Sequence, residues 1–268
     1  VKRHTKRDSN HGGCRIQPLW KKFAPWMDVL KNGKNSRYAD WFMVENWEQI
    51  GKRADTRDRR FYSFAFSDGM PKLNTNNEEV IQYFCKICED WIRDYDIDGI
   101  RFDVGNEVSH RFLKRIREHL KKIKPDIYLL GEIWHDASQW LLGDEYDSVM
   151  NYPLLSGIHD FFLDQTMKKE EFEYMVNRCY TMYMQQNNNV LFNLLDSHDT
   201  ERLINRLHNL DIFYQQLAIF LHFPEVHVFI TGRRSLWRAP MIRIAEGACR
   251  GAKSRVMRTR SGLGRSTV

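Results

Sequence analysis

Short apolar segments alternate with segments of helical periodicity between residues 76 and 221, and this alternation restricts the chain to a few folds. The apolar segments predicted as strands are 99–104, 127–130, 147–152 and 190–195. The predicted helices run from a cap at Asn76 or Asn77 to about residue 92, over about 106–122, within 160–185 and around 201–221. Strands that alternate with helices form parallel βα units. We therefore predict an α/β fold with a parallel sheet.

The segment before this region has a different character. Residues 23–75 are rich in aromatic side chains and contain turn signals at Asn32-Gly33 and Asp68-Gly69, but few long periodic stretches. We interpret these residues as an irregular, loop-rich subdomain.

The composition excludes several classes of protein. A chain of 268 residues can bury a sizeable core in one large or two small domains, and 13% aromatic residues are too many for a disordered protein. The sequence shows no run of 18 apolar residues and no signal peptide, so we expect no contact with a membrane. The five cysteines are unevenly spaced and form no disulfide framework, which favours a cytoplasmic location.

The net charge of +6 is unevenly distributed along the chain. Residues 1–22 hold seven basic side chains and one acidic one, and residues 232–268 hold ten basic and one acidic, whereas the segment between them is acidic. Basic ends are common in proteins that bind nucleic acid. These ends lack interleaved aromatic residues and any recognisable binding module, so we expect no nucleic-acid partner.

Three of the predicted strands end in acidic side chains. Asp103 follows the first strand, with Arg101 two residues earlier on the same face; Glu132 follows the second; and 196–199 supplies a third acidic cluster. In a parallel α/β barrel the carboxyl ends of all strands meet at one rim, where active sites lie. Two facing carboxylates suit the cleavage of a glycosidic bond. The alternative is that each acid only caps the helix that follows it.

Several motifs in this region resemble signatures of one enzyme family. They are GIRFDVGNEVSH at 99–110, GEIWHD at 131–136, LDSHDTER at 195–202 and MPKLN at 70–74. The first three resemble the second, third and fourth signatures of the α-amylase superfamily of glycoside hydrolases. The motif MPKLN resembles the marker of the neopullulanase, cyclomaltodextrinase and maltogenic amylase subfamily. Residues 23–42 are similar to the start of that subfamily's inserted loop domain. The resemblance covers roughly 23–221.

The resemblance implies a role for each of the acidic residues. Asp103 would be the catalytic nucleophile, Glu132 the general acid/base, and Asp199 the third acid, which holds sugar hydroxyls and stabilises the distorted transition state. Arg101 would keep Asp103 ionised by charge pairing, and His198 would hydrogen-bond the sugar.

Two neighbours of the acid/base would also contact substrate. Trp134 would offer an apolar face to a glucose ring, unless it is simply a core tryptophan, and His135 would lie at the rim of the same site. The resemblance implies a retaining mechanism, in which the two catalytic carboxyl groups lie about 5–5.5 Å apart. The implied fold is a partial (β/α)8 TIM barrel with strands four to seven and part of the inserted loop domain.

The implied function is hydrolysis, and also transglycosylation, of α-1,4 and α-1,6 glucosidic bonds in cyclodextrins, pullulan or maltooligosaccharides. The implied partner is therefore an α-glucan oligosaccharide. A full-length parent could form a homodimer and could bind calcium, but no calcium site can be named in this sequence. A non-catalytic remnant that binds glucans weakly is the alternative function.

The family's first signature, Asp-Ala-Val-Phe-Asn-His, is expected just before Phe23 and is absent. Codons can be chosen for 13–20 that read as this signature in a shifted frame, and codons for 223–232 and 234–251 yield family-like segments in the same way. We therefore interpret 1–22 and 222–268 as out-of-frame segments, which also accounts for their basic character.

The resulting domain hypothesis places the loop-rich subdomain at 23–75 and a partial catalytic barrel at 76–221. A partial barrel leaves sheet edges and apolar helix faces uncovered. We therefore expect the chain as written to fold poorly and to have little activity.

Three other patterns have competing interpretations. Cys85 and Cys88 have redox or metal spacing but occupy the core face of a predicted helix, which we favour. Glu107, His110 and His135 could suggest a metal site, but we interpret them as rim residues and predict no metal ligands. The basic run at 114–122 is predicted to be the solvated face of an outer helix.

Overall fold

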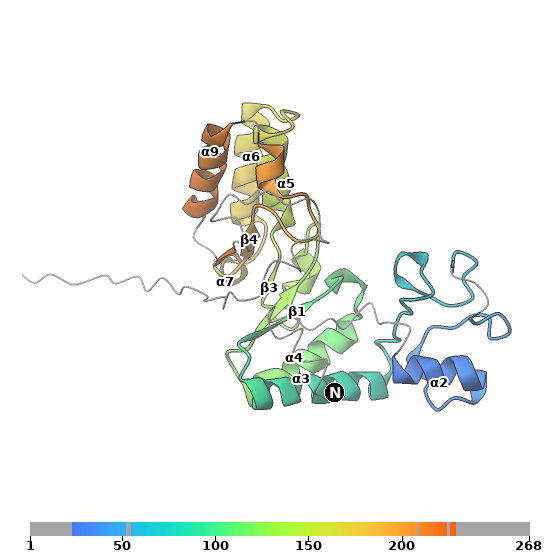
Figure 1. Ribbon diagram of the computed structural model, residues 1–268. Helices are drawn as coiled ribbons and strands as arrows, with labels where there is room; N and C mark the ends of the chain where they lie inside the picture. The colour runs from blue at the N-terminus through green and yellow to red at the C-terminus, as the bar shows by residue number, and fades with distance from the viewer. Residues whose placement is uncertain (1–22, 52–54, 208, 224–225, 229–268) are drawn as a thin grey trace, which may run out of the picture.

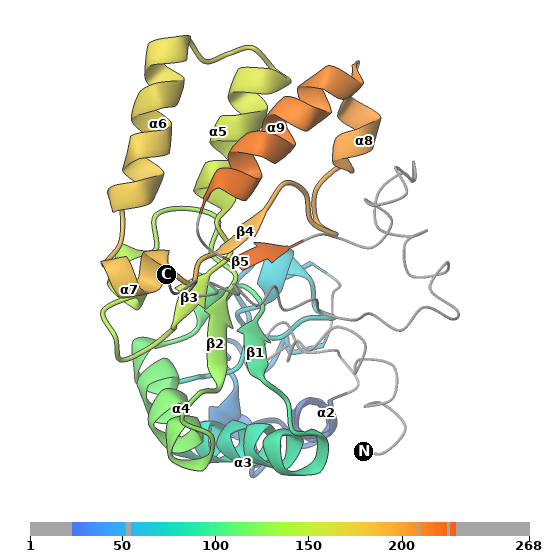
Figure 2. The ribbon, with the colours of Figure 1, turned by 90° about the vertical axis from the view of Figure 1, so that its left-hand side faces the viewer.

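The computed structural model describes residues 23–51, 55–207, 209–223 and 226–228. The sheet lies between the helix pair at 78–95 and 110–123 and a group of helices at 152–162, 169–181, 203–206 and 210–222 (Figures 1 and 2). The segment around the helix at 24–32 extends from the N-terminal end of the helix at 78–95 (Figure 1). The predictions for 1–22 and for most of 222–268 lie outside the described residues.

Residues 23–75, which we interpret as a loop-rich subdomain, form an irregular segment. Its described residues contain one α-helix, α2 (Ala24–Asn32), with Pro25 in its first turn, and three short 3-10 turns. Its backbone pairs through isolated antiparallel bridges such as Phe42 to Leu73. Trp26 is buried between Phe42 and Phe61, with ring centroids 4.7 and 4.8 Å away, so aromatic packing stabilises this segment where regular secondary structure is sparse.

The first two barrel helices are close to their predicted positions. Helix α3 (Glu78–Tyr95) begins after Asn77, whose side chain accepts hydrogen bonds from the backbone N–H groups of Glu79 and Val80. Helix α4 (His110–Ile123) begins later than the predicted residue 106, because Ser109 caps it and Gly105–Glu107 form a 3-10 turn. The two helices pack together through Phe84 and Phe112, and they cover one side of the sheet (Figure 2).

The predicted parallel sheet is confirmed. Strands β1 (Gly99–Phe102), β2 (Tyr128–Gly131) and β3 (Ser148–Val149) form one parallel sheet, and β4 (Phe192–Leu194) pairs in parallel with β5 (Val226–Val228). A parallel bridge between Met150 and Phe192 joins the two sheets, so five strands lie side by side in chain order. Strand β5 falls within the segment that we interpreted as out of frame.

The remaining helices differ from their predicted limits. Helix α5 (Tyr152–Phe162) begins where we expected the third strand to end, because Asn151 accepts a hydrogen bond from the backbone of Leu154 and caps it. The predicted helical stretch to 185 is divided into α6 (Lys169–Thr181) and α7 (Gln185–Asn188), and the last one into α8 (Leu203–Arg206) and α9 (Leu210–His222). Helices α5, α6 and α9 enclose a second apolar core around Ile158 and Phe220.

No helix in the described part of the chain is long and apolar enough to cross a membrane.

Candidate active site

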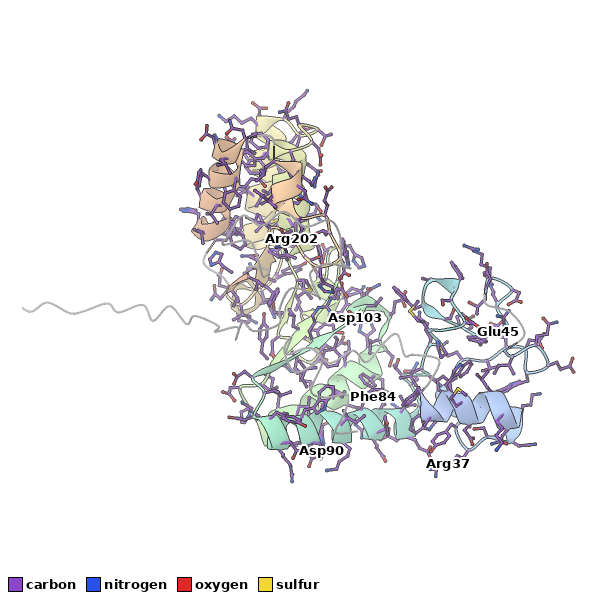
Figure 3. All side chains as sticks on the ribbon, in the orientation of Figure 1. Arg37, Glu45, Phe84, Asp90, Asp103 and Arg202 are labelled. Atoms are coloured by element: carbon purple, nitrogen blue, oxygen red, sulfur yellow. The ribbon has the colours of Figure 1, made fainter. Side chains whose placement is uncertain are left out.

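Arg101, at the end of β1, is the centre of an acidic cluster. Its Nη1 donates to Asp103 Oδ1 at 2.7 Å, while its Nη2 lies 3.0 Å from Glu132 Oε2 and 4.0 Å from Asp199 Oδ2. Figure 3 shows Asp103 between the helix layer that contains Phe84 and the group of elements that contains Arg202. The structure thus brings the three predicted acids and the predicted arginine together at the carboxyl ends of the strands.

The electrostatic balance of the cluster favours a charged arginine. Burial disfavours the charged guanidinium, but the attraction of Glu132 and the hydrogen bond to Asp103 outweigh it and raise the pKa of Arg101 above its usual value. The Nε of Arg101 donates to the sulfur of Met150 at 3.3 Å. Because Met150 is buried, this contact restricts the orientation of the guanidinium.

A strained turn after β1 holds Asp103 and Glu132 together. Val104 has a φ of +49°, a left-handed conformation that is costly for a β-branched residue. In this conformation its N–H donates to Glu132 Oε2 at 3.1 Å, and the N–H of Gly105 donates to the carbonyl oxygen of Glu132 at 2.9 Å. Both acidic residues are buried, at 8% and 5% exposure. The strain therefore lies beside a pair of buried carboxylates, where backbone strain is typical of a functional site.

The acids of the third cluster divide into a capping residue and a site residue. Asp196 is buried, and its Oδ2 accepts from the backbone N–H of Leu203 at the start of α8, as the helix-cap alternative predicted for such acids. Asp199 is more exposed and faces Arg101, and His198 Nε2 lies 3.0 Å from its Oδ2. The N–H of Asp199 donates to Ser197 Oγ, which fixes the turn.

Comparison with known proteins identifies the family. Residues 19–230 match the family model described as the alpha amylase catalytic domain. The chain belongs to the alpha-amylase family. It is 43% identical over 215 residues to a cyclomaltodextrinase of a Bacillus species, an alignment that covers 80% of this chain and 36% of that protein. It is also 47% identical over 184 residues to an intracellular maltogenic amylase of Bacillus subtilis, with coverages of 69% and 30%.

A solved structure agrees with the sequence relatives. A cyclomaltodextrinase structure superposes with a TM-score of 0.76 at 38% identity, covering 85% of this chain and 39% of that one. The expected partial TIM barrel is therefore confirmed, and the chain spans only about a third of the length of the curated relatives that it matches.

One aromatic side chain of this alpha-amylase domain, two residues after Glu132, is exposed to solvent on one face. The ring of Trp134 stacks on that of Tyr152, with centroids 3.9 Å apart and planes at 9°, and Trp134 remains 50% exposed. The hydroxyl of the buried Tyr152 donates to Ser197 Oγ at 3.3 Å. Trp134 is thus not a core tryptophan, because its outer face is open.

Sequence reasoning missed the two residues that support this arrangement, Met150 and Tyr152. Both lie in 147–152, which we predicted as an ordinary strand, and only their position directly after β3 could have marked them as rim residues.

His135 is less closely connected to the acidic cluster than expected. In the described part of the chain its contacts are a hydrogen bond to the carbonyl oxygen of Asp136 and a ring contact with Trp140, rather than contacts with the carboxylates.

The residues that could have suggested a metal site have other partners. Glu107 forms an ion pair with Lys72 at 2.8 Å, and His110 Nδ1 lies 2.8 Å from Glu145. Among the residues that the structure describes, no group of three His, Cys, Asp or Glu side chains could hold a metal ion.

The Cys85–Cys88 pair lies on the buried side of α3, so the core interpretation is confirmed. Burial raises the pKa of the Cys85 thiol to about 12, which suppresses the reactive thiolate.

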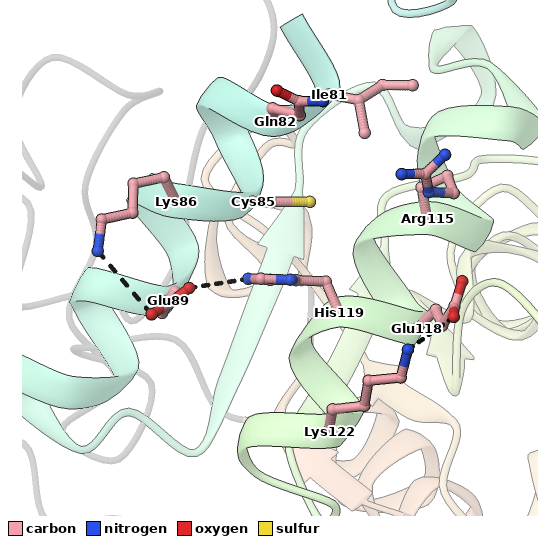
Figure 4. Close-up of a pocket in the computed structure, with 9 residues that line it drawn as sticks. All are labelled: Ile81, Gln82, Cys85, Lys86, Glu89, Arg115, Glu118, His119 and Lys122. Carbon is pink, nitrogen blue, oxygen red and sulfur yellow. Dashed lines mark hydrogen bonds and ion pairs between the residues drawn. The ribbon is translucent and has the colours of Figure 1, made fainter. Parts of the chain in front are cut away.

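A groove of about 290 Å³ between α3 and α4 lies on the outer helix layer rather than at the carboxylates (Figure 4). Most of its charged side chains pair with one another, Glu89 with Lys86 and His119 and Glu118 with Lys122, while Arg115 pairs with Glu78 outside the lining. The basic run of α4 is only partly the solvated face that we predicted, because Arg117 and Lys121 both turn inward to bind Asp147.

Proposed function

We propose that the cluster around Arg101 catalyses retaining hydrolysis, and also transfer, of α-1,4 and α-1,6 glucosidic bonds. The observation that carries this proposal is that one guanidinium contacts three carboxylates from three separate strand ends. Similar proteins include cyclomaltodextrinases, a maltogenic amylase and a neopullulanase, so the proposed substrates are cyclodextrins, pullulan and maltooligosaccharides.

The chemistry assigns one step to each buried carboxylate. Asp103, which is paired with Arg101, attacks the anomeric carbon and forms a covalent glycosyl ester, while Glu132 donates a proton to the departing glycosidic oxygen. Glu132 then removes a proton from water, which attacks the same carbon and releases Asp103. Transfer results when a sugar hydroxyl replaces the water. We expect the two carboxyl groups to lie about 5–5.5 Å apart.

The remaining residues bind the sugar. Asp199 and His198 are exposed enough to accept and donate hydrogen bonds to sugar hydroxyls, and the open face of Trp134 can stack on a glucose ring. His135 stays a proposed rim residue. One relative is named as intracellular, which supports a cytoplasmic location. Dimer formation and calcium binding, which the resemblance allows for a longer parent, form no part of the proposal.

Trapping the covalent intermediate tests the proposal directly. Glu132→Gln incubated with α-maltosyl fluoride should accumulate one maltosyl group on Asp103, because fluoride leaves without a proton donor but water is no longer activated. Intact-mass and peptide mass spectrometry would detect the adduct. Asp103→Asn provides the control, and the proposal is wrong if the two variants give the same mass.

A second candidate is a glucan-binding remnant without turnover. It is favoured by the open face of Trp134 and the exposed His198, because both can contact a sugar without any turnover. Glucan binding that Asp103→Asn leaves unchanged, together with the absence of any adduct, would support this candidate instead.

A further inference from the structure

Tyr146 lies directly beneath the turn that joins the two buried carboxylates. Its side chain is 1% exposed, and its ring packs against Phe102, the last residue of β1, with centroids 5.5 Å apart. The hydroxyl donates to the carbonyl oxygen of Gly105 at 3.0 Å. Gly105 is two residues beyond Asp103.

Two glycines make room for this tyrosine. A Cβ on Gly131, the residue before Glu132, would lie 2.6 Å from Tyr146 Cε2, and a Cβ on Gly105 would lie 2.8 Å from the hydroxyl oxygen. Both distances are too short for any other residue to be accommodated without movement. The close approach therefore explains why glycine occupies both positions.

The tyrosine completes a set of hydrogen bonds around Glu132. The N–H of Gly105 donates to the carbonyl oxygen of Glu132, and the N–H of Val104 donates to its side-chain Oε2. Glycine is the most freely rotating residue, so an unrestrained Gly105 would weaken both bonds. The Tyr146 hydroxyl holds the other side of Gly105, and Gly105 is thus fixed at its carbonyl and at its N–H.

We propose that Tyr146 is a positioning residue that holds the carboxyl group of Glu132 in place for proton transfer. This inference rests on the proposed role of Glu132 as the proton donor. Burial raises the pKa of Tyr146 well above its usual value, so the hydroxyl remains a donor throughout the pH range in which such an enzyme would work.

The test uses Tyr146→Phe, which removes only the hydroxyl, with Tyr128→Phe as the matched control. The hydroxyl of Tyr128 also donates to a backbone carbonyl, that of Val190 at 2.7 Å, but from the first residue of β2. Each variant loses the hydrogen bond that its tyrosine hydroxyl donates to a backbone carbonyl. Only the first loss affects the turn beside Glu132.

The kinetic comparison uses two substrates that differ in their need for a proton. Departure of a sugar from maltotriose requires general acid catalysis, whereas fluoride leaves α-maltosyl fluoride with little assistance. We expect Tyr146→Phe to lower kcat on maltotriose by about tenfold or more, with a much smaller loss on the fluoride and KM unchanged. Tyr128→Phe should lower kcat by the same factor on maltotriose and on the fluoride. Equal losses for Tyr146→Phe on the two substrates would overturn the inference.

A second measurement needs no turnover. Amide hydrogen exchange at Val104 and Gly105, followed by NMR, should accelerate in Tyr146→Phe and stay unchanged in Tyr128→Phe. Unchanged exchange in Tyr146→Phe contradicts the inference even if the unmodified chain cleaves neither substrate. If the unmodified chain cleaves neither substrate, the proposed function fails, and the exchange measurement alone tests the role of Tyr146.

Discussion

Arg101 balances the charge of the site at the scale of single residues, because three carboxylates lie within 4.0 Å of its guanidinium. The motif allowed the sequence to predict that Arg101 would pair with Asp103. The sequence could not predict that Met150 would accept a hydrogen bond from the same guanidinium. That contact depends on how β2 pairs with both β1 and β3, and a spacing of 49 residues carries no signal for it.

Removal of this guanidinium should destabilise the folded chain. Arg101→Met removes the positive charge beside two buried carboxylates, so the free energy of unfolding should fall by about 3–5 kcal/mol. Arg101→Lys keeps the charge but not the planar guanidinium that contacts two carboxylates at once. Its free energy of unfolding should lie between those of the parent and of Arg101→Met. Urea denaturation measures both values, and a Met variant as stable as the parent would contradict the charge-balance argument.

Gly131 offers a second test at the residue scale. Gly131→Ala forces a methyl group against the buried ring of Tyr146, and overpacking of this kind costs about 1–3 kcal/mol. Gly69→Ala is the control, because its Cβ would meet its nearest neighbour at 3.4 Å, an ordinary contact. The same denaturation experiment should leave Gly69→Ala close to the parent; a similar loss in both variants would exclude the packing explanation.

At the scale of elements, a buried histidine joins α5 to the end of β4. His159 Nδ1 accepts from Arg206 of α8 at 2.9 Å, and its Nε2 therefore carries the proton and donates to the carbonyl oxygen of Leu195 at 3.0 Å. Leu195 directly precedes the segment that contains Asp199. Neither the sequence pattern nor the family motifs indicated this link, because His159 lies on a helix with no motif around it.

This link makes stability depend on pH in a defined direction. Burial, together with the positive charge of Arg206, lowers the pKa of His159 from 6.5 to about 4. The unfolded chain thus binds a proton at a higher pH than the folded chain, and the stabilisation is complete above pH 6.5 and is lost as the pH falls from 6.5 to about 4.

The slope of stability against pH checks this prediction. His159→Gln should flatten the fall in unfolding free energy over this range, measured by urea denaturation at a series of pH values. His227→Gln serves as the control, since it removes another histidine of the chain. An equal slope in the parent and in His159→Gln would show that other groups cause the dependence.

At the scale of the whole molecule, the part of the chain that the structure describes forms a sheet with two open edges. Within the described residues β1 pairs only with β2, and β5 pairs only with β4, so each has an unpaired edge. A full barrel has no such edges. We expect maltotriose hydrolysis by the purified chain to be well below that of a full-length relative measured in parallel; comparable turnover would refute this.

The hypothesis that both ends of the chain are out of frame predicts extra or missing bases when the coding DNA is sequenced again across codons 13–23 and 216–236. An unchanged reading would leave the basic ends as genuine parts of the protein. Residues 226–228 lie in the second of these regions and form β5 in parallel with β4. Sequencing of codons 216–236 is therefore the more informative of the two, because a shifted frame there would change the sequence of a strand.

The sequence by itself determined the order of strands and helices and the parallel sheet, because apolar periodicity is local. Asp103 and Glu132 could be placed at the site because each directly follows its strand, whereas Asp199 was singled out by the resemblance of its motif to the family signature. The tertiary structure decided that Asp196 caps a helix while Asp199 faces Arg101, that Trp134 is open, and that Met150, Tyr146 and Tyr152 support the site. Apart from the cap of Asp196 on Leu203, seven positions away, these contacts join residues 18 to 98 positions apart, and only the packing of neighbouring strands brings such residues together.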